Sequence, residues 1–488
     1  MKLNFIHYLV SALLTFIVTW TAGAQPKTVL TPGQQQLVQN VDGQASFYQK
    51  MAKDIWDWAE MGYKEYKSSA LLQKALMDAG FRMEAGVAGM PTGFVASFGQ
   101  GHPIIGILAE FDALPGVSQD AVPYQQERAD CTAGHACGHN LFGVGSVAAA
   151  IAVKSWLANS GQPGTIRLYG TPAEEGGSGK VYMVRAGLFD DVDAVLHWHA
   201  GSFNSASAGS CLAVKSATFK FTGIASHAAG SPHRGRSALD GVEAMNHMVN
   251  MMREHVPQET RLHYVITKGG EAPNVVPAYA EVYYYVRHPQ MKDVKEIFER
   301  LVLAAKGAAM GTETKVEYEI DGGAYNLLPN EALSAIMHKN LDLVGGVIYN
   351  TEERAFAEQL MTTLDMPGLK PEDAAKVLPF RVSNEAAPFS TDVGDVSWMV
   401  PTAGLSTATW VPGTTAHSWQ AVASGGMSIG YKGMLNAAKT MAMSAQDLFK
   451  NPAVLSQAKA ELLKRRGQDF KYEALLGTRD VPLNYRDK

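Results

Sequence analysis

The sequence is organised around one seven-residue stretch, Gly134-His135-Ala136-Cys137-Gly138-His139-Asn140. It offers a thiol and two imidazoles as metal ligands, and its glycines allow the backbone to turn tightly around an ion. An apolar run over 103–108 precedes it and is typical of a strand, and an apolar run over 141–159 follows it and predicts a buried helix. The rest of the chain decides whether this stretch is a site.

Strands and helices alternate on both sides of this stretch. Strands are predicted over 95–98, 104–108, 164–170 and 194–199, and helices over 31–80, 141–159 and 179–186. This alternation predicts a doubly wound α/β domain. In such sheets, ligands bind at the carboxyl ends of the strands.

The pattern changes near residue 210. Predicted strands over 213–223, 261–267, 278–287 and 315–321 and helices over 237–254 and 291–305 follow in the order β-α-β-β-α-β. This order is typical of a small ferredoxin-like insertion. We therefore expect an α/β domain over 25–210, an inserted α+β domain over 211–323, and a return to the first domain over 324–488.

Size and charge exclude some classes of protein. A chain of 488 residues is too long for one average domain, and its 46% hydrophobic and 18% charged residues describe an ordinary soluble globular protein. The net charge of −5 gives no basic surface for phosphate backbones. We expect no nucleic-acid partner.

The N-terminus is typical of a secretory signal peptide over 1–24. Lys2 precedes an apolar run over 5–20, and Ala22-Gly23-Ala24 supplies a cleavage pattern before Gln25. A membrane anchor, the alternative, needs about 20 apolar residues, and this run is shorter and interrupted. We expect no later stretch to be long and apolar enough to span a bilayer. We expect an exported protein, periplasmic or secreted, with no membrane partner after cleavage.

Three cysteines in an exported chain cannot all form disulfides with one another. Cys131 and Cys137 could pair, and this disulfide is one interpretation. A cysteine inside a turn rich in glycine and histidine is better explained as a thiolate ligand, because a bound ion protects it from oxidation. Cys211 is interpreted as a small buried residue.

Polar residues follow the predicted strands of the α/β domain. Glu110 and Asp112 follow one strand, Glu174 and Glu175 follow the next, and His199 ends the third. The candidate metal ligands are Cys137, His139, Glu175, His199 and His417. Five ligands of mixed sulfur, nitrogen and oxygen type exceed the needs of one structural zinc and suit two ions about 3.5–4 Å apart.

The adjacent glutamates suit two roles. In an extended loop, neighbouring side chains point in opposite directions, so we assign Glu175 as a ligand and Glu174 as the general base. An acidic first turn of a helix is compatible with both roles. Asp112 is interpreted as a carboxylate that orients a ligand, and an ordinary turn aspartate before Pro115 is the alternative.

Five motifs together resemble those of the dinuclear metal amidohydrolases, which include aminoacylases, glutamate carboxypeptidases, and indole-acetyl-amino-acid and hippurate hydrolases. The motifs lie at 134–139, 172–177, 226–229, 274–277 and the late His417. Within this family, Asn140 and the stretches 110–116 and 390–398 look like the aminobenzoyl-glutamate hydrolase B-subunit group.

The resemblance implies a metallopeptidase domain of mixed sheet with an inserted lid, and a homodimer formed through that lid. It implies two divalent ions, zinc or manganese, held by Cys137, His139, Glu175, His199 and His417, with Glu174 as the base. His197 lies on the same strand face as His199 and competes with it. The spacing in sequence from Glu175 favours His199.

In the lid, the resemblance implies that His227 and Asn274 reach a substrate. His227 would enter the partner subunit's site and hold the scissile carbonyl or its oxyanion. Arg287 would bind a substrate carboxylate, and a solvated surface arginine is the alternative. The chain departs from the family pattern at two places. Asn140 stands where many relatives have an aspartate, and the stretch 285–289 at the end of the predicted lid strand differs from that of many relatives.

We therefore expect a two-metal amidohydrolase that releases a free amino acid from an N-acyl or N-aroyl amino acid such as aminobenzoyl-glutamate. A broad dipeptidase using the same site is one alternative. A catalytically silent, metal-dependent binding protein is another, and the intact Glu174 argues against it.

Overall fold

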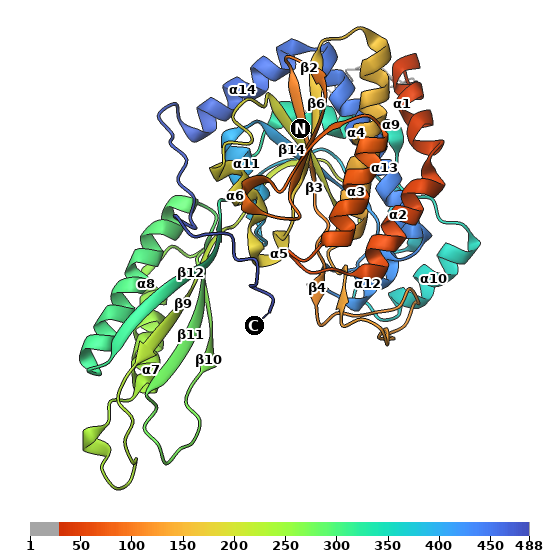
Figure 1. Ribbon diagram of the computed structural model, residues 1–488. Helices are drawn as coiled ribbons and strands as arrows, with labels where there is room; N and C mark the ends of the chain where they lie inside the picture. The colour runs from red at the N-terminus through yellow and green to blue at the C-terminus, as the bar shows by residue number, and fades with distance from the viewer. Residues whose placement is uncertain (1–28, 488) are drawn as a thin grey trace, which may run out of the picture.

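The computed structural model describes residues 29–487, and the predicted signal peptide lies outside the described residues. Two units stand beside each other in Figure 1, each with its own sheet and its own hydrophobic core. The chain forms most of the larger unit, leaves it to form the smaller one, and then returns.

The larger unit is built on a six-stranded mixed sheet. Its strand order is β1-β2-β6-β3-β7-β14, in which β6, β3, β7 and β14 are parallel and β1 and β2 form an antiparallel edge. The strands are β1 (Arg82–Ala85), β2 (Phe94–Gln100), β3 (Ile104–Ala109), β6 (Gly164–Gly170), β7 (Ala194–Gly201) and β14 (Thr402–Ala408). The predicted mixed α/β fold is confirmed.

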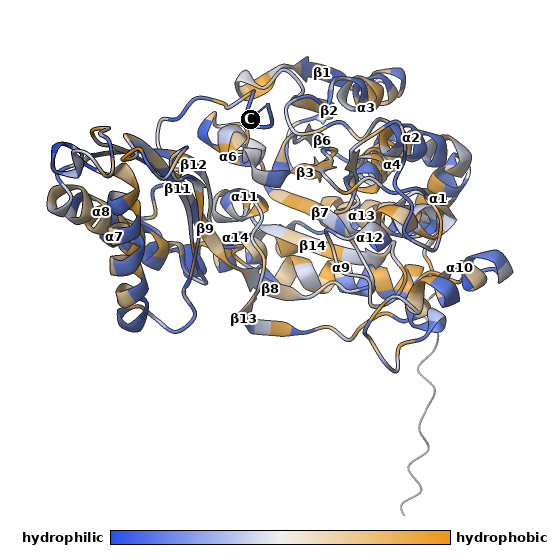
Figure 2. Cartoon of the chain, turned by 90° about the horizontal axis from the view of Figure 1, so that it is seen from below, coloured by the Kyte–Doolittle hydropathy of each residue, from blue (hydrophilic) through white to orange (hydrophobic). Residues whose placement is uncertain are grey.

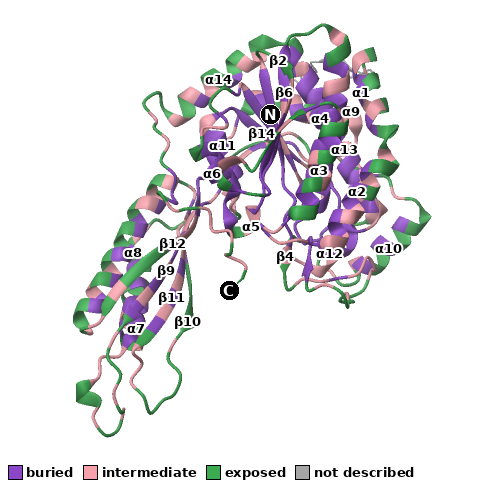
Figure 3. Ribbon diagram, viewed as in Figure 1, coloured by how far each residue is buried: buried purple, intermediate pink, exposed green. Residues whose placement is uncertain are grey.

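Helices cover both faces of this sheet (Figure 1 and Figure 3). On one side lie α1 (Pro32–Asp42), α2 (Ala45–Trp58), α3 (Tyr66–Asp78), α4 (His139–Ser160), α9 (Glu331–Val344) and α13 (Ser428–Lys450). On the other lie α6 (Gly179–Arg185) and α11 (Val393–Met399). The predicted helical region over 31–80 is thus three helices, interrupted by turns.

The central helix α4 is buried on almost every side, as its even distribution of apolar residues requires. By length and composition it could cross a membrane, so the prediction that no later stretch is apolar enough was wrong. However, 83% of its apolar window is buried inside the protein, as in the core helix of a globular fold. Its Gly145 allows close packing on β7, where a Cβ atom would lie 2.8 Å from the Trp198 ring.

The smaller unit has a four-stranded antiparallel sheet of order β10-β11-β9-β12. Its elements are β9 (Ala213–Thr222), α7 (Ala238–Met252), β10 (Arg261–Lys268), β11 (Tyr279–His288), α8 (Met291–Gly311) and β12 (Lys315–Ala324). The chain order is the predicted β-α-β-β-α-β. Figure 1 and Figure 2 show α7 and α8 on the outer face and the sheet turned toward the larger unit.

The remaining α-helices and strands lie outside the two main sheets. They are β4 (Leu114–Pro115), β5 (Ala133–Gly134), α5 (Glu174–Gly177), β8 (Ala208–Cys211), α10 (Thr351–Met361), β13 (Val382–Ala387), α12 (Trp419–Gly425) and α14 (Pro452–Arg466). After α14, the C-terminal segment runs between the two units and ends beside α5 (Figure 1). The carboxyl ends of the parallel strands meet near this place, which is where such sheets bind ligands.

Candidate metal centre

The turn over 134–139 is anchored from behind by a histidine. The Nε2 atom of His135 lies 3.1 Å from the carbonyl oxygen of Ile55 in α2, and His135 is buried. Burial lowers the pKa of His135 to about 3, so the ring is neutral and donates this hydrogen bond. His135 therefore positions the turn, while the next residues of the motif carry the candidate ligands.

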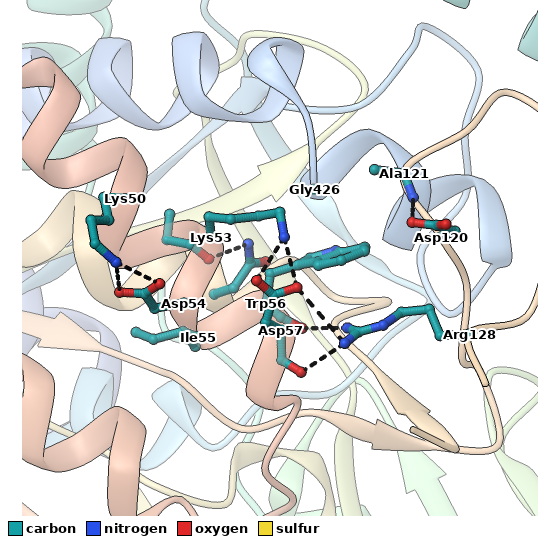
Figure 4. Close-up of polar contacts among 12 residues, drawn as sticks. Lys50, Lys53, Asp54, Ile55, Trp56, Asp57, Asp120, Ala121, Arg128 and Gly426 are labelled. Atoms are coloured by element: carbon teal, nitrogen blue, oxygen red, sulfur yellow. Dashed lines mark hydrogen bonds and ion pairs between the residues drawn. The ribbon is translucent and has the colours of Figure 1, made fainter. Parts of the chain in front are cut away.

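The end of α2 that receives this hydrogen bond is itself held in place (Figure 4). Arg128 donates to the carbonyl oxygens of Trp56 at 3.3 Å and Asp57 at 3.1 Å, and its guanidinium lies 4.8 Å from the centre of the Trp56 ring. The indole of Trp56 donates to the carbonyl of Val422 at 3.0 Å. No sequence pattern indicated this support, because its parts are far apart in the chain.

Three of the predicted ligands form a first group. Cys137, His139 and His199 offer donor atoms that all lie within 4.8 Å of one another. The Sγ atom of Cys137 is 3.4 Å from Nε2 of His199, and Nδ1 of His199 donates to the carbonyl oxygen of Ala200 at 2.8 Å. That hydrogen bond leaves the lone pair of Nε2 free to bind an ion.

A second group shares the cysteine with the first. Cys137, Glu175 and His417 also lie within 4.8 Å of one another, and Nε2 of His417 is 3.1 Å from a carboxylate oxygen of Glu175. The backbone N–H of His417 donates to the carbonyl oxygen of Ala136 at 2.9 Å, which fixes the late loop onto the turn. All five predicted ligands are thus brought together at one edge of the sheet.

Asp112 connects the two groups. One carboxylate oxygen lies 2.9 Å from Nδ1 of His139, and the other accepts the backbone N–H of Glu175 at 2.9 Å. This geometry fits a carboxylate that orients ligands rather than an ordinary turn aspartate. Burial disfavours a charge on His139, yet the carboxylates of Glu110 and Asp112 raise its pKa well above the usual range.

The residues present fit divalent metal ions. Nε2 of His139 lies 2.9 Å from Oε2 of Glu110, but the contact lacks the direction of a hydrogen bond, and both buried atoms are left without a hydrogen-bond partner. Burial raises the pKa of the Cys137 thiol, so the thiolate needs a cation beside it. A bound ion would supply the missing partner for this nitrogen and this oxygen, which lie beside a buried thiol.

A buried lysine lies behind this group. Nζ of Lys180 is 2.7 Å from Oε1 of Glu110 and 2.7 Å from Oδ1 of Asp392, and all three side chains are buried. The backbone N–H of Lys180 also donates to Asp392 at 2.8 Å. Sequence reasoning missed this trio, since Lys180 is one more polar residue in a short helix and Asp392 is more than 200 residues away.

The two adjacent glutamates do separate, but not for the predicted reason. Glu174 and Glu175 lie in the one-turn helix α5 rather than in an extended loop, and the turn is irregular, with φ −70° and ψ 69° at Glu175. Glu175 joins Cys137 and His417, whereas Glu174 joins Glu110 and His139. Burial, with the nearby carboxylates of Glu110 and Glu175, raises the pKa of Glu174 well above its usual range.

His197 and Asn140 lie outside the ligand groups found among the described residues. The ring of His197 packs on Gly404, where a Cβ atom would lie 2.4 Å from it, and His197 belongs to none of the ligand groups among the described residues. The amide of Asn140 donates to the carbonyl oxygens of Ala52 at 3.3 Å and Gly425 at 3.2 Å. Asn140 therefore ties α4 to α2 and α12, a role that an ionised aspartate cannot fill.

The three cysteines are free, so the alternative disulfide between Cys131 and Cys137 is not observed. The Cys131 thiol instead donates to the carbonyl oxygen of Ala133 at 3.3 Å. Cys211 is buried, as predicted.

Two predicted substrate residues lie outside this cluster within the same chain. The backbone N–H of Ala228, beside His227, donates to the carbonyl oxygen of Asn274 at 3.0 Å. This contact joins the loop after β9 to the loop before β11, at the end of the smaller unit's sheet that is far from the larger unit (Figure 1). His227 is exposed, and its Nδ1 accepts the backbone N–H groups of Ala229 and Gly230.

Arg287 lies at the other end of the smaller unit, near the end of β11. Its Nη1 atom is 3.5 Å from the hydroxyl of Ser390, and its guanidinium lies 5.3 Å from the centre of the Tyr285 ring. Its Nε atom is buried and has no hydrogen-bond partner. Arg287 is thus a cation with an unused donor at the junction of the two units, unlike a solvated surface arginine.

A mixed α/β sheet whose carboxyl edge gathers thiol, imidazole and carboxylate ligands is the fold and site of a metal-dependent hydrolase. A model of peptidase family M20/M25/M40 matches residues 106–418, more than half of the chain. The chain belongs to this family and is a hydrolase acting on amide bonds. The predicted kinship with the metal amidohydrolases is confirmed.

Individual relatives agree with this assignment. The B subunit of p-aminobenzoyl-glutamate hydrolase from Escherichia coli (strain K12) is 45% identical over 443 residues, which cover 85% of this chain and 91% of that protein. The Xaa-Arg dipeptidase of Homo sapiens is 30% identical over 458 residues, 88% of this chain and 90% of that protein.

A solved structure shows the same fold. The YXEP protein of Bacillus subtilis, described as a dinuclear metal binding peptidase from the M20 family, has a TM-score of 0.57 at 16% sequence identity, covering 84% of this chain and 99% of that chain.

The substitution Asn140→Asp tests the position at which the chain departs from many relatives. A carboxylate there would face two carbonyl oxygens and lose both hydrogen bonds, so we expect the free energy of unfolding to fall by about 2 kcal/mol or more at pH 8. The new aspartate would have a raised pKa in the folded state, so stability should decrease as pH rises from 5 to 8. Urea unfolding at both pH values measures this.

The matched control is Asn159→Asp, at an exposed position of the same helix. It should change stability by less than about 1 kcal/mol, through the helix dipole and the loss of one exposed hydrogen bond to Ser155. Equal stability of Asn140→Asp and the wild type at pH 8 would contradict the structural role of Asn140.

Proposed function

We propose that the chain binds two divalent ions, zinc or manganese, through Cys137, His139, Glu175, His199 and His417, and hydrolyses the amide of an N-acyl or N-aroyl amino acid. The observation that carries this proposal is the membership of Cys137 in both ligand groups. A thiolate shared between two groups of three ligands is suited to a pair of neighbouring ions.

Glu174 is the proposed general base. When bound, divalent ions polarise a carbonyl and acidify a water molecule. Glu174 would accept the proton of the attacking water and return it to the leaving nitrogen as the amide bond breaks. Its raised pKa, caused by burial and by Glu110 and Glu175, suits a group that both takes and gives a proton near neutral pH.

The proposed substrate carries a free carboxylate on its amino-acid part. Arg287 supports this, because its buried Nε lacks a partner and its guanidinium lies near Ser390 at the junction of the two units. Aminobenzoyl-glutamate is the first substrate to test, since the name of the 45% identical relative specifies that amide. A dipeptide is the second, because the 30% identical relative is named a dipeptidase.

The proposed assembly is a homodimer formed through the lid, in which His227 and Asn274 reach the partner's substrate. Two features support it. The loops that carry these residues lie far from the ligand groups of their own chain (Figure 1). The strand β10 forms an edge of the lid sheet, and its Val265 is 54% exposed. Exposed apolar edge strands of this kind are commonly covered by another segment or another chain.

The first experiment measures metal content and hydrolysis in the wild type and in Glu174→Ala. We expect close to two ions per chain in both proteins, release of free amino acid by the wild type, and a loss of at least about 100-fold in kcat in the variant. The substrates are aminobenzoyl-glutamate, hippurate, acetyl-amino acids and simple dipeptides.

The control variant is Glu127→Ala, in an exposed loop, which should behave as the wild type. Turnover of dipeptides alone would favour the dipeptidase. Bound metal without turnover would leave the silent, metal-dependent binding protein, and absence of both bound metal and turnover would overturn the amidohydrolase.

A mixing experiment tests the dimer. Glu174→Ala and His227→Ala should each be nearly inactive. Their mixture, after subunit exchange, should recover about a quarter of wild-type activity, because half of the dimers are hybrids with one complete site each. Absence of recovery despite demonstrated exchange would place His227 outside the partner's site. A monomer by light scattering would leave a different protein chain as the partner, as the name of the E. coli relative implies for that protein.

We further propose export to the periplasm or the medium, with residues 1–24 removed as a signal peptide. The apolar run over 5–20 and the pattern Ala22-Gly23-Ala24 support this. Sequencing of the mature protein from an exporting host should give an N-terminus at Gln25. A retained Met1 on protein found in the cytoplasm would reject the proposal.

A further inference from the structure

The turn that carries Glu174 and Glu175 is not stable by its own geometry. Ala173 and Ser178, which flank it, have φ values of 56° and 60°, and Gly176 within it has φ 87°. Residues other than glycine are rarely found in this left-handed region, and they stay there only when the surrounding structure holds them. The positions of both glutamates therefore depend on contacts from outside the turn.

Three of these contacts come from the larger unit itself. The carboxylate of Glu65 accepts the backbone N–H of Ala173 at 2.9 Å, and Asp112 accepts that of Glu175 at 2.9 Å. The hydroxyl of Tyr63 donates to the carbonyl oxygen of Gly177 at 2.8 Å. These contacts hold both ends of the turn but leave the carbonyl of Glu175 to another part of the chain.

That carbonyl is held by the C-terminal segment. The hydroxyl of Tyr485 donates to the carbonyl oxygen of Glu175 at 3.0 Å, and the guanidinium of Arg486 donates to the same oxygen. The two donors are more than 300 residues from Glu175 in the sequence. Figure 1 shows the end of the chain beside α5.

The C-terminal segment is anchored along its length. Tyr472 donates to Asp395 at 2.7 Å, and Tyr182 of α6 donates to the carbonyl oxygen of Asp480 at 3.0 Å. Near the turn, the Tyr485 ring meets the Tyr63 ring edge-on at 5.7 Å. Gly62 leaves the space for this approach, because a Cβ atom there would lie 2.2 Å from the Tyr485 hydroxyl. The C-terminal segment thus packs against the turn that carries Glu174 and Glu175.

We propose that Tyr485 and Arg486 are positioning residues for the two catalytic glutamates. By holding the Glu175 carbonyl, they orient the turn so that Glu175 faces Cys137 and His417 while Glu174 faces Glu110 and His139. The inference rests on the proposed function for the roles of those glutamates. The segment lies beyond residues 106–418, to which the family model extends, so the family match does not supply this contact.

The test uses the full chain with Tyr485→Phe, Arg486→Ala and both together. We expect the double variant to bind the more weakly held ion roughly 10- to 100-fold less tightly, as for other residues that orient ligands. Chelator competition measures this affinity without reference to activity. We also expect kcat to fall with KM nearly unchanged, and the absorption spectrum of the cobalt-substituted protein to change.

The controls separate positioning from general destabilisation. Arg465→Ala removes an arginine from α14 that pairs with Glu461 and Glu331, away from the turn, and it should keep wild-type metal affinity. Arg486→Lys, which still donates, should restore part of the affinity. Tyr485→Phe removes one hydroxyl, so it should fold even if the double variant does not.

Wild-type metal affinity and kcat in folded Tyr485→Phe and Arg486→Ala would overturn the inference, as would an equal loss in Arg465→Ala. A wild type without hydrolytic activity, combined with weakened metal binding in the variants, would reject the proposed function and keep the inference.

Discussion

The structure depends on the burial of several carboxylates at the carboxyl edge of one sheet. Glu110, Asp112 and Asp392 are buried there, and Glu174 is close to the first of them. Lys180 supplies a positive charge to this cluster, and its Nζ atom contacts both Glu110 and Asp392. Unpaired buried carboxylates are costly, so the remaining negative charge makes divalent ions favourable partners for this edge.

The same charge balance explains how the site divides its carboxylates. Lys180 and His139 hold the pKa of Glu110 below its usual range, despite its burial. The pKa of Asp392 is raised to about 6 by burial, although Lys180 opposes the shift. For Glu174, burial and the carboxylates of Glu110 and Glu175 outweigh the opposing charge of Lys180, so its pKa is raised well above the usual range. One carboxyl is therefore free to exchange a proton while its neighbours stay ionised and hold ligands.

Long-range contacts then fix the geometry that this charge requires. His135 fastens the cysteine turn to the end of α2, and Arg128 fastens that end in turn. The carbonyl of Glu175 receives hydrogen bonds from the last described residues. A site assembled from loops at the ends of parallel strands has no regular hydrogen-bond ladder of its own, so side chains from distant segments complete it.

Much of the site could be predicted from the sequence because its ligands are marked by local patterns. Cys137 and His139 stand in one glycine-rich turn, and Glu174 and Glu175 are adjacent. Alternating strands and helices placed these residues at one edge, and the choice of His199 over His197 agrees with the ligand groups of the structure. The assumption of an extended loop at the two glutamates was wrong, because the left-handed turn there is imposed by contacts from elsewhere.

The sequence by itself determined the fold class, the family and the types of ligand, since hydrophobic periodicity and short motifs are local properties. It did not reveal the contacts of Lys180 with Glu110 and Asp392. It also did not reveal the hydrogen bonds of Asn140 to α2 and α12, or those of Tyr485 and Arg486 to the carbonyl of Glu175. Only the tertiary structure decided these, because each joins residues separated by tens to hundreds of positions. Burial, which gives these contacts their energetic weight, exists only once the chain is folded.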